Sequence, residues 1–373
     1  MISIILYSFV VLKSKTWEVI NMPIQVVDLF CGVGGLTRGL LDAGLNVIAG
    51  FDIDPTCQFT YENNNHVNYH LRNIREVMGE EIEGLYDENA TRVLVGCAPC
   101  QPFSQMRFKL KGANEQDDKY NLLLEFGRLI QETHPAVISM ENVPQIKETC
   151  IYDQFIEILQ NNNYHFDAKV VFCPDYGIPQ TRRRFVLVAS LLGPINIIEP
   201  THNRNDVHVQ DYIGNLPPIA AGETHPDDPM HRSASLSEKN LQRIQASVPG
   251  GTWRDWPEEL RCKCHRKESG KTYSSVYGRM TWEQIGPTIT TQFYSYGTGR
   301  YGHPEQDRAL SLREGALLQT FPEDYNFINP DAPFVFGDIA RHIGNAVPVR
   351  LGEIIGITIT QHLEDYGIVG GAE

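Results

Sequence analysis

The feature that most constrains the fold is an apolar run that ends in a glycine-rich turn and continues as a helical pattern. Residues 26–30 are apolar except at the centre, and the turn Cys-Gly-Val-Gly-Gly follows at 31–35. Leucines then recur at helical spacing up to Gly44. This order predicts a strand, a tight turn and a helix.

The same alternation continues along the first half of the chain. Further strands are expected at 46–51, 92–96, 136–140, 169–173 and 185–189, with helices at 122–133 and 152–162. Strands that alternate with helices predict a parallel, doubly wound α/β sheet. From about Thr201 the alternation stops. Regular structure is expected again at a capping box, Ser311 and Glu314, and in a last helix at 348–363.

These patterns divide the chain into parts. Residues 22–200, completed by 335–373, are expected to form the larger domain, and 201–334 a smaller, mostly irregular or β domain. Residues 1–21 are treated as an N-terminal extension outside the fold, either disordered or the product of an upstream start site. The apolar stretch at 4–12 is too short to span a bilayer and lacks the flanks of a secretory signal, so we expect a cytoplasmic protein without a membrane span.

Charge is unevenly distributed. The whole chain carries a formal charge of −14, which argues against a protein that coats nucleic acid non-specifically. Residues 232–313, however, hold 13 Lys and Arg against 8 Asp and Glu, a local balance of +5 that leaves −19 elsewhere. One basic region on an acidic body fits a protein that meets a polyanion on one face, although a plain solvated surface remains an equal alternative on charge alone.

The eight cysteines are scattered, which predicts reduced thiols and no disulfide framework. Cys262, Cys264 and His265 are of the types that bind metals, but no second ligand pair lies at a familiar spacing. We therefore expect loop side chains there, and no metal.

The glycine turn is suited to a nucleotide-like ligand. Gly32, Gly34 and Gly35 would allow close backbone approach, and Asp52 follows about twenty residues later, where a carboxylate takes ribose hydroxyls. The spacing departs from GxGxxG, which favours S-adenosylmethionine (SAM) over a dinucleotide. A purely structural turn also remains open at this point.

Cys100 lies in Ala-Pro-Cys-Gln-Pro-Phe-Ser, directly after the third expected strand. Doubly wound sheets place active residues at the carboxyl ends of their strands, and a thiolate there is a strong nucleophile. The alternative for a lone cysteine is a small core residue. Glu141 ends the next strand, beside the Cys100 loop, and Arg182 and Arg184 belong to a basic block that suits phosphates or a base carbonyl.

Six blocks, in this order, resemble the DNA (cytosine-5) methyltransferases of bacterial restriction-modification systems. They are Asp-Leu-Phe-Cys-Gly-Val-Gly-Gly (28–35), Pro-Cys-Gln-Pro-Phe-Ser (99–104), Glu-Asn-Val (141–143), Gln-Thr-Arg-Arg-Arg (180–184), Arg-Glu to Leu-Gln-Thr-Phe-Pro (313–322) and Gly-Asn-Ala-Val-Pro (344–348). The blocks span nearly the whole chain. The resemblance implies a class I SAM-dependent methyltransferase fold, which is Rossmann-like, with a small target-recognition domain.

The resemblance also assigns roles. Cys100 would be the nucleophile, Glu141 the partner of cytosine N3, and Arg182 and Arg184 contacts near a flipped-out cytosine, with Arg184 nearer O2. SAM would be bound by Phe30, Gly32, Gly34, Gly35, Asp52, Ile53, Asn73, Pro99 and Asn345. Ile53 is smaller than the family's usual side chain, and Asn73 replaces its usual aspartate, so both matches are imperfect.

DNA would be bound by the loop after Cys100 and by the region 201–301. Ser104, Arg107, Thr288, Arg254 and Arg279 are the residues we expect to contact it. The region interleaves basic and aromatic side chains, some of which must form the small domain's core: Trp253, Arg254, Trp256, Arg261, Lys263, Arg266, Lys267, Lys271, Tyr273, Tyr277 and Arg279.

Two other functions stay open. One branch of the resembled family methylates cytosine in tRNA, but its Cys-Phe-Thr signature is absent here. A catalytically silent DNA-binding relative is disfavoured by the intact Cys100, Glu141 and Arg184. We expect a monomer that acts on double-stranded DNA in the nucleoid, and by analogy we favour a functional pairing with a restriction endonuclease.

Overall fold

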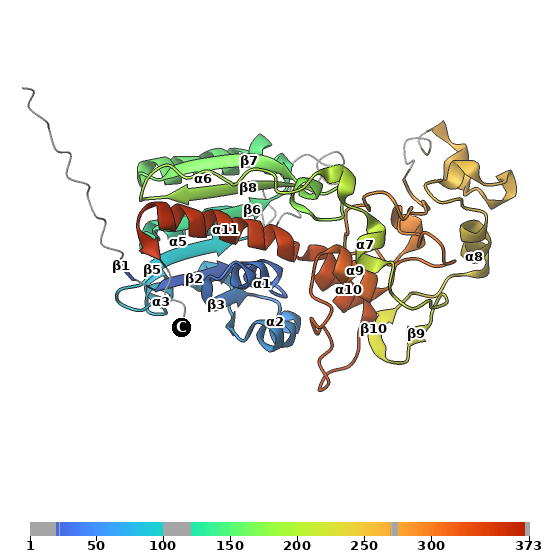
Figure 1. Cartoon of the computed structure of the whole chain (residues 1–373), viewed down its shortest axis with the longest axis horizontal. Helices are drawn as coiled ribbons and strands as arrows, with labels where there is room; N and C mark the ends of the chain where they lie inside the picture. The colour runs from blue at the N-terminus through green and yellow to red at the C-terminus, as the bar shows by residue number, and fades with distance from the viewer. Residues whose placement is uncertain (1–19, 22, 100–120, 269, 271–274, 370–373) are drawn as a thin grey trace, which may run out of the picture.

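The computed structural model describes residues 20–21, 23–99, 121–268, 270 and 275–369. One seven-stranded sheet lies at its centre (Figure 1). In spatial order its strands are β4 (Asn68–Leu71), β3 (Asn46–Asp52), β2 (Ile24–Leu29), β5 (Thr91–Gly96), β6 (Val137–Asn142), β8 (Arg183–Ser190) and β7 (His165–Phe172).

The first five strands of this order are parallel, as the alternation predicted, and β7 runs in the same direction, but β8 differs. β8 runs antiparallel to both β6 and β7. The expectation of a wholly parallel sheet was therefore wrong at this edge. Only residues 173–182 join β7 to β8, and a parallel crossover needs a dozen residues or more. The short connection produces a hairpin instead.

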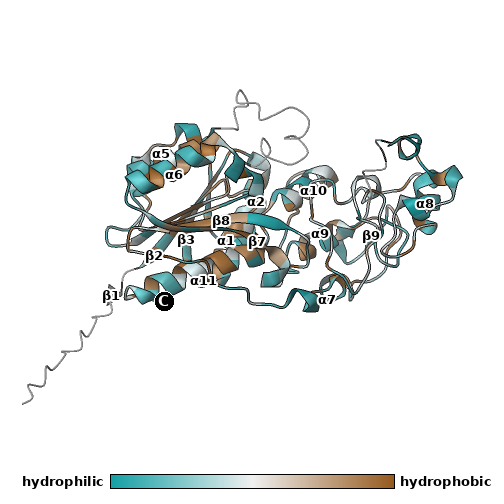
Figure 2. Ribbon diagram, turned by 90° about the horizontal axis from the view of Figure 1, so that it is seen from above, coloured by the Kyte–Doolittle hydropathy of each residue, from teal (hydrophilic) through white to brown (hydrophobic). Residues whose placement is uncertain are grey.

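Helices cover both faces of the sheet (Figure 2). On one face α1 (Gly35–Asp42) packs against α11 (Val349–Asp365), and Leu40 and Ile355 share a core with Val26. On the other face α5 (Leu122–Thr133) and α6 (Cys150–Asn161) bury Phe126 and Phe155 against Val27. Because neighbouring strand residues point to opposite faces, Val26 and Val27 supply the two cores. The C-terminal helix thus returns to the sheet domain.

Smaller elements complete this part of the molecule. α2 (Gln58–Asn65) follows β3, and α3 (Gly79–Glu83) lies beside α5. β1 (Ile20–Asn21) pairs in parallel with β11 (Ile368–Val369), so the last two residues of the expected N-terminal extension do join a sheet. In the described part of the chain, no helix is long and apolar enough to cross a membrane.

A second lobe extends from one end of the sheet domain (Figure 1). It has little regular structure, consisting of α7 (Val209–Ile213), β9 (Thr224–His225), β10 (Asp228–Arg232), α8 (Glu238–Gln245) and α9 (Leu312–Leu318). α10 (Phe336–Asn345) packs against α9 and leads back to α11. Short 3-10 helices occur at 55–57, 74–76, 144–148, 173–176, 204–206, 253–255, 258–260, 263–266 and 296–298.

The predicted capping box at α9 is confirmed. Ser311 Oγ accepts the amide hydrogen bond of Glu314 at 3.1 Å, and Glu314 Oε2 accepts that of Ser311 at 2.7 Å. Glu314 is fully buried, and Arg308 donates to both of its carboxylate oxygens at 2.7 Å. The glutamate therefore caps one helix and anchors a buried guanidinium as well.

Candidate active site

The carboxyl ends of β2, β3, β5 and β6 meet at one edge of the sheet. Phe30, Asp52, Pro99 and Glu141 each lie at or just beyond the end of one of these strands. Parallel neighbouring strands bring these four positions together although the chain separates them. The structure thus assembles, at a single edge, residues predicted to bind the cofactor and a residue predicted to act on the base.

The glycine turn after β2 has both tightly packed and open positions. Phe30, Gly32 and Gly34 have φ values of +61°, +51° and +85°. A Cβ on Gly35 would lie 2.2 Å from the Val347 carbonyl oxygen, so this glycine permits close packing on the C-terminal segment. A Cβ on Gly32 would meet no atom of the described residues within 4 Å. The space in front of Gly32 fits a ligand that approaches the backbone, as SAM would.

Asp52, at the end of β3, holds this turn in place. Its carboxylate accepts amide hydrogen bonds from Gly32 and Asp54, both at 2.9 Å. Burial raises the pKa of Asp52, and these amide donors counteract the rise. Ile53 next to it is 65 % exposed, so it presents an apolar side chain at the edge. Asn73 accepts the Arg75 amide at 3.3 Å and begins a 3-10 helix.

Beneath the turn lies a buried carboxyl group. Asp28, within β2, is fully buried, and Thr37 of α1 donates to its Oδ2 at 2.6 Å. The Tyr61 hydroxyl lies 3.1 Å from the same threonine oxygen. Burial raises the pKa of Asp28 to about 7, with a further contribution from Asp52 and opposition from the Thr37 hydrogen bond. The floor of the turn is therefore poor in water and holds a carboxyl group that ionises reluctantly.

Glu141, at the end of β6, is held from two sides. Its side chain is 3 % exposed, and Arg184 Nε of β8 lies 2.8 Å from its Oε1. Cys97, the first residue after β5, donates its thiol to Oε2 at 2.7 Å. Glu141 and Arg184 were predicted as catalytic residues from separate blocks. The structure places them in contact because β6 and β8 are neighbours in the sheet.

The segment that leads to Cys100 is tied to the same strand end. Asn142 Nδ2 donates to the Ala98 carbonyl at 3.1 Å, and its Oδ1 accepts the Val143 amide at 2.9 Å. This links β6 to the residues just before the predicted nucleophile. Cys100, Ser104 and Arg107 themselves lie outside the described residues.

Arg182 joins the two lobes. Its guanidinium is buried and donates to the carbonyls of Ile289 at 3.1 Å and Ala346 at 3.3 Å. Thr288 Oγ1 donates to the Thr181 carbonyl at 3.3 Å, which adds a second link at this point. Asn345 is exposed at the end of α10. This placement favours a positioning role for Arg182 over direct contact with a base.

The two expected DNA-binding arginines in the second lobe differ in exposure. Arg254 is exposed and its guanidinium lies over the Trp253 ring. Arg279 is 7 % exposed, and its Nη2 lies 2.5 Å from Asp307 Oδ1. Such a paired, buried guanidinium has little left to offer DNA. The structure therefore favours Arg254 of the two.

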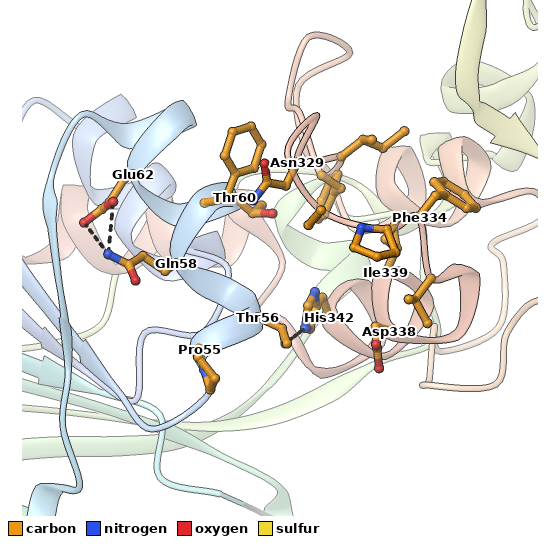
Figure 3. A pocket seen from close by; sticks show the side chains of 16 residues that line it. Pro55, Thr56, Gln58, Thr60, Glu62, Asn329, Phe334, Asp338, Ile339 and His342 are labelled. Atoms are coloured by element: carbon orange, nitrogen blue, oxygen red, sulfur yellow. Dashed lines mark hydrogen bonds between the residues drawn. The ribbon is translucent and has the colours of Figure 1, made fainter.

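A separate cavity of about 560 Å³ lies between α2 and residues 327–342 (Figure 3). Phe59, Phe334 and Ile339 contribute apolar walls. His342 Nε2 and Thr56 Oγ1 meet at 2.9 Å on one side of it. The residues that line the described cavity include none of the predicted SAM ligands. It is therefore a neighbour of the site, and not the site itself.

Comparison with known proteins decides the family. A family model described as C-5 cytosine-specific DNA methylase matches residues 24–361. This chain belongs to that family. It is accordingly an enzyme that methylates C5 of cytosine in DNA, and SAM is the methyl donor that the family implies.

Relatives and solved structures agree with this assignment. The chain is 52 % identical over 343 residues to Type II methylase M.HgiDII of Herpetosiphon aurantiacus, which covers 91 % of this chain and 96 % of the relative. It is 28 % identical to Type II methyltransferase M1.BsuMI of Bacillus subtilis, with 91 % and 81 % covered. The crystal structure of Schizosaccharomyces pombe Dnmt2 methyltransferase superposes with a TM-score of 0.63 at 15 % identity, covering 92 % and 99 %. At that identity the structural likeness shows the fold alone.

Two residues of this methyltransferase's site were missed by the sequence reasoning. Cys97 had no assigned role, yet its thiol contacts the carboxylate of Glu141. Asn142 lay inside a quoted block, but only the structure shows its bond to the Ala98 carbonyl. A polar residue at the carboxyl end of a strand was the signal that both positions carried: Cys97 follows β5, and Asn142 ends β6.

Proposed function

We propose that this methyltransferase modifies one cytosine in a specific double-stranded DNA sequence by covalent catalysis through Cys100, and that it serves a Type II restriction-modification system. The role in a restriction-modification system is inferred from the similarity to Type II methylases such as M.HgiDII. The observation that carries the mechanism is the position of Glu141. It is buried between Arg184 and the segment that leads to Cys100.

SAM, when bound, supplies the methyl group. The residues that would hold it line the open side of the glycine turn and the adjoining strand ends. They are Phe30, Gly32, Gly34, Gly35, Asp52, Ile53, Asn73, Pro99 and Asn345. The exposed Ile53 and the space in front of Gly32 are consistent with a ligand at this edge.

The cytosine is expected to be flipped out of the duplex, at a cost of a few kcal/mol. The Cys100 thiolate then forms a bond to C6, and the electron pair of the C5–C6 double bond moves toward C5 and the ring. A protonated Glu141 donates its hydrogen to N3, which relieves the negative charge in the ring. Methyl transfer to C5 leaves S-adenosylhomocysteine. The C5 proton then passes to solvent, N3 returns its proton to Glu141, and the electron pair of the C6–S bond leaves with the Cys100 sulfur as the C5–C6 double bond re-forms.

Arg184 has two tasks in this scheme. Its Nε lies 2.8 Å from Glu141 Oε1, which orients the carboxyl group. Its side chain is 14 % exposed, and we infer that the exposed part contacts the base carbonyl O2. Arg182 would act indirectly, by holding the lobes together through Ile289 and Ala346.

DNA is expected to lie between the two lobes, with the region 201–301 reading its sequence. Arg254 is the exposed arginine that we favour for a DNA contact. A bidentate contact from an arginine to guanine contributes about 1–3 kcal/mol of discrimination. Bisulfite sequencing of methylated plasmid would reveal the recognition sequence, and the neighbouring genes would reveal whether an endonuclease accompanies the enzyme.

The proposal is tested with radiolabelled SAM, plasmid DNA and tRNA. The wild-type protein and Cys150→Ala, which alters an exposed cysteine on α6, should both label DNA, whereas Cys100→Ala should not. The wild type should also form a covalent adduct with a duplex that contains 5-fluorocytosine. Label in tRNA alone would favour the RNA-methylating alternative, and labelled DNA from Cys100→Ala would refute the nucleophile.

A further inference from the structure

Three side chains with metal-binding atoms converge in the outer part of the second lobe. Cys262, Cys264 and His265 each offer one ligand atom, and these atoms all lie within 4.8 Å of one another. They belong to the 3-10 turn at 263–266, which Cys262 begins. We infer that this cluster binds one Zn²⁺ ion, which fastens the turn to the aromatic core of the lobe.

The local backbone already presents the ligands for this task. The sulfur of Cys262 accepts the backbone amide of His265, and a ring nitrogen of His265 accepts that of Cys262 at 3.3 Å. This reciprocal pair brings the first and last ligand together without long-range help. The sequence spacing alone predicted incidental loop side chains. The convergence of the three atoms is what changes the interpretation.

The ligand set suits zinc. Thiolates select zinc among the common divalent ions, and imidazole joins them in Cys–His sites. Zinc bonds are about 2.3 Å to sulfur and about 2.0–2.1 Å to nitrogen, so atoms that already lie within 4.8 Å of one another need to move only closer to share one ion. Cys264 is exposed, and a water molecule would take the fourth position on that side.

A second cluster in the molecule shows what an unsuitable site looks like. Asp54, Cys57 and His342 also lie within ligand distance of one another. There, however, Arg341 Nη1 lies 2.6 Å from Asp54 Oδ2, and the His342 ring bonds to Thr56. A guanidinium already neutralises that carboxylate. In the proposed zinc cluster, the thiol of Cys262 lies 3.8 Å from the Tyr277 hydroxyl, a weaker contact than that between Arg341 and Asp54.

A bound ion would stabilise the outer part of the lobe, because the hydrophobic core there is small. The cluster of buried residues there consists of Ile244, Trp253, Trp256, Tyr296 and Ala309. His265 stacks on Trp253 with ring centroids 4.1 Å apart. None of the described cysteines forms a disulfide, so no such bond supports this core within the described chain. Small cores are commonly supplemented by a structural metal, and the His265 stack would connect the ion to this one.

Charge is compatible with the ion. Residues 261–267 contain four cationic side chains, Arg261, Lys263, Arg266 and Lys267. An isolated divalent cation would be repelled there. Two thiolates, however, cancel the charge of Zn²⁺, so the occupied site adds no net charge to the segment. The basic surface that we expect to face DNA would therefore be kept.

The test is the zinc content of the purified full-length protein, measured by inductively coupled plasma mass spectrometry. We expect about one ion per chain in the wild type and in Cys150→Ser, and loss of the ion in Cys262→Ser and His265→Ala. His265→Cys keeps a ligand at that position and should retain the metal. Binding of SAM, measured by calorimetry, should persist in every variant because the sheet domain is remote from the turn.

Further readouts keep the inference falsifiable if a variant fails to fold. Wild-type protein reconstituted with Co²⁺ should show thiolate-to-cobalt charge-transfer absorption, and removal of zinc by a chelator should expose the lobe to protease while the sheet domain stays intact. Wild-type protein that carries no zinc and takes none up from Zn²⁺ solution would overturn the inference. So would a Cys262→Ser protein that keeps the full metal content.

Discussion

The buried carboxyl group of Asp28 makes a quantitative prediction about stability and pH. It lies fully buried beneath the glycine turn, and its Oδ1 has no hydrogen-bond partner among the described residues. Burial raises its pKa from 3.8 to about 7. Asp28→Asn keeps the size and shape of the side chain but cannot ionise. The variant should therefore be spared the cost of a buried charge.

The sign and magnitude follow from proton linkage. Between pH 4 and 7 the unfolded chain releases this proton and the native protein keeps it, so wild-type stability falls as pH rises through this window. The whole difference, from 3.8 to about 7, corresponds to about 4 kcal/mol. From pH 5 to pH 8 the wild type should lose about 3 kcal/mol of unfolding free energy, since this free energy stops falling with pH above the native pKa. Asp28→Asn lacks this loss, so its stability relative to the wild type should rise by about 3 kcal/mol between pH 5 and pH 8.

The assay is urea unfolding at pH 5 and at pH 8, followed by circular dichroism. Comparing the two pH values removes any constant cost of placing an amide at this site. Asp153→Asn, on the exposed surface of α6, is the matched control and should differ from the wild type equally at both pH values. If the advantage of Asp28→Asn over the wild type is the same at pH 5 and pH 8, the reasoning about the buried carboxyl group is refuted.

Three further predictions concern the site and its support. Glu141→Gln should lower kcat by about 100- to 10,000-fold, since the amide lacks an acidic proton, while calorimetry shows unchanged SAM affinity; full activity would exclude the proton-donor role. Glu314→Gln should cost about 3–5 kcal/mol in urea unfolding because it leaves the buried Arg308 without its charge partner, and a loss below 1 kcal/mol would contradict this. Gly44→Ala should lower the free energy of unfolding only by the left-handed strain of about 1–2 kcal/mol. Gly34→Ala has a similar φ, but its Cβ would lie 2.4 Å from the Asn65 side chain, so this variant should lose more stability and bind SAM less tightly. Equal melting temperatures of the two variants would refute the difference.

Much of the site was predictable because its parts are local. A strand, a glycine turn and a helix at 24–42 are recognisable from residues that are close in the chain. The capping box of Ser311 and Glu314 was read from a spacing of three residues and is confirmed. The placement of Glu141 beside the Cys100 segment followed from a general property of parallel sheets. The first two depend on backbone periodicity or on neighbours within one turn, and the third on the parallel pairing of β5 and β6.

Other features depended on contacts between distant segments. The antiparallel edge was missed because a strand's hydrophobic pattern does not reveal its direction. Arg182 looked like one of three equivalent arginines, yet it is buried against Ile289, 107 residues away. Arg279 looked like a surface cation until the fold brought Asp307 to it. No local pattern distinguishes a guanidinium that meets solvent from one that meets a distant partner.

The amino-acid sequence by itself determined the order of the elements, the capping box of α9, the glycine turn and the candidates for the reacting groups, because these depend on side-chain chemistry and on spacing along the backbone. The tertiary structure decided which of those groups touch. It paired Glu141 with Arg184 and Cys97, directed Arg182 to the junction of the lobes, and gathered Cys262 and His265 around a common point. Burial and pairing arise when segments far apart in the chain exclude water together, and only the folded chain specifies where that happens.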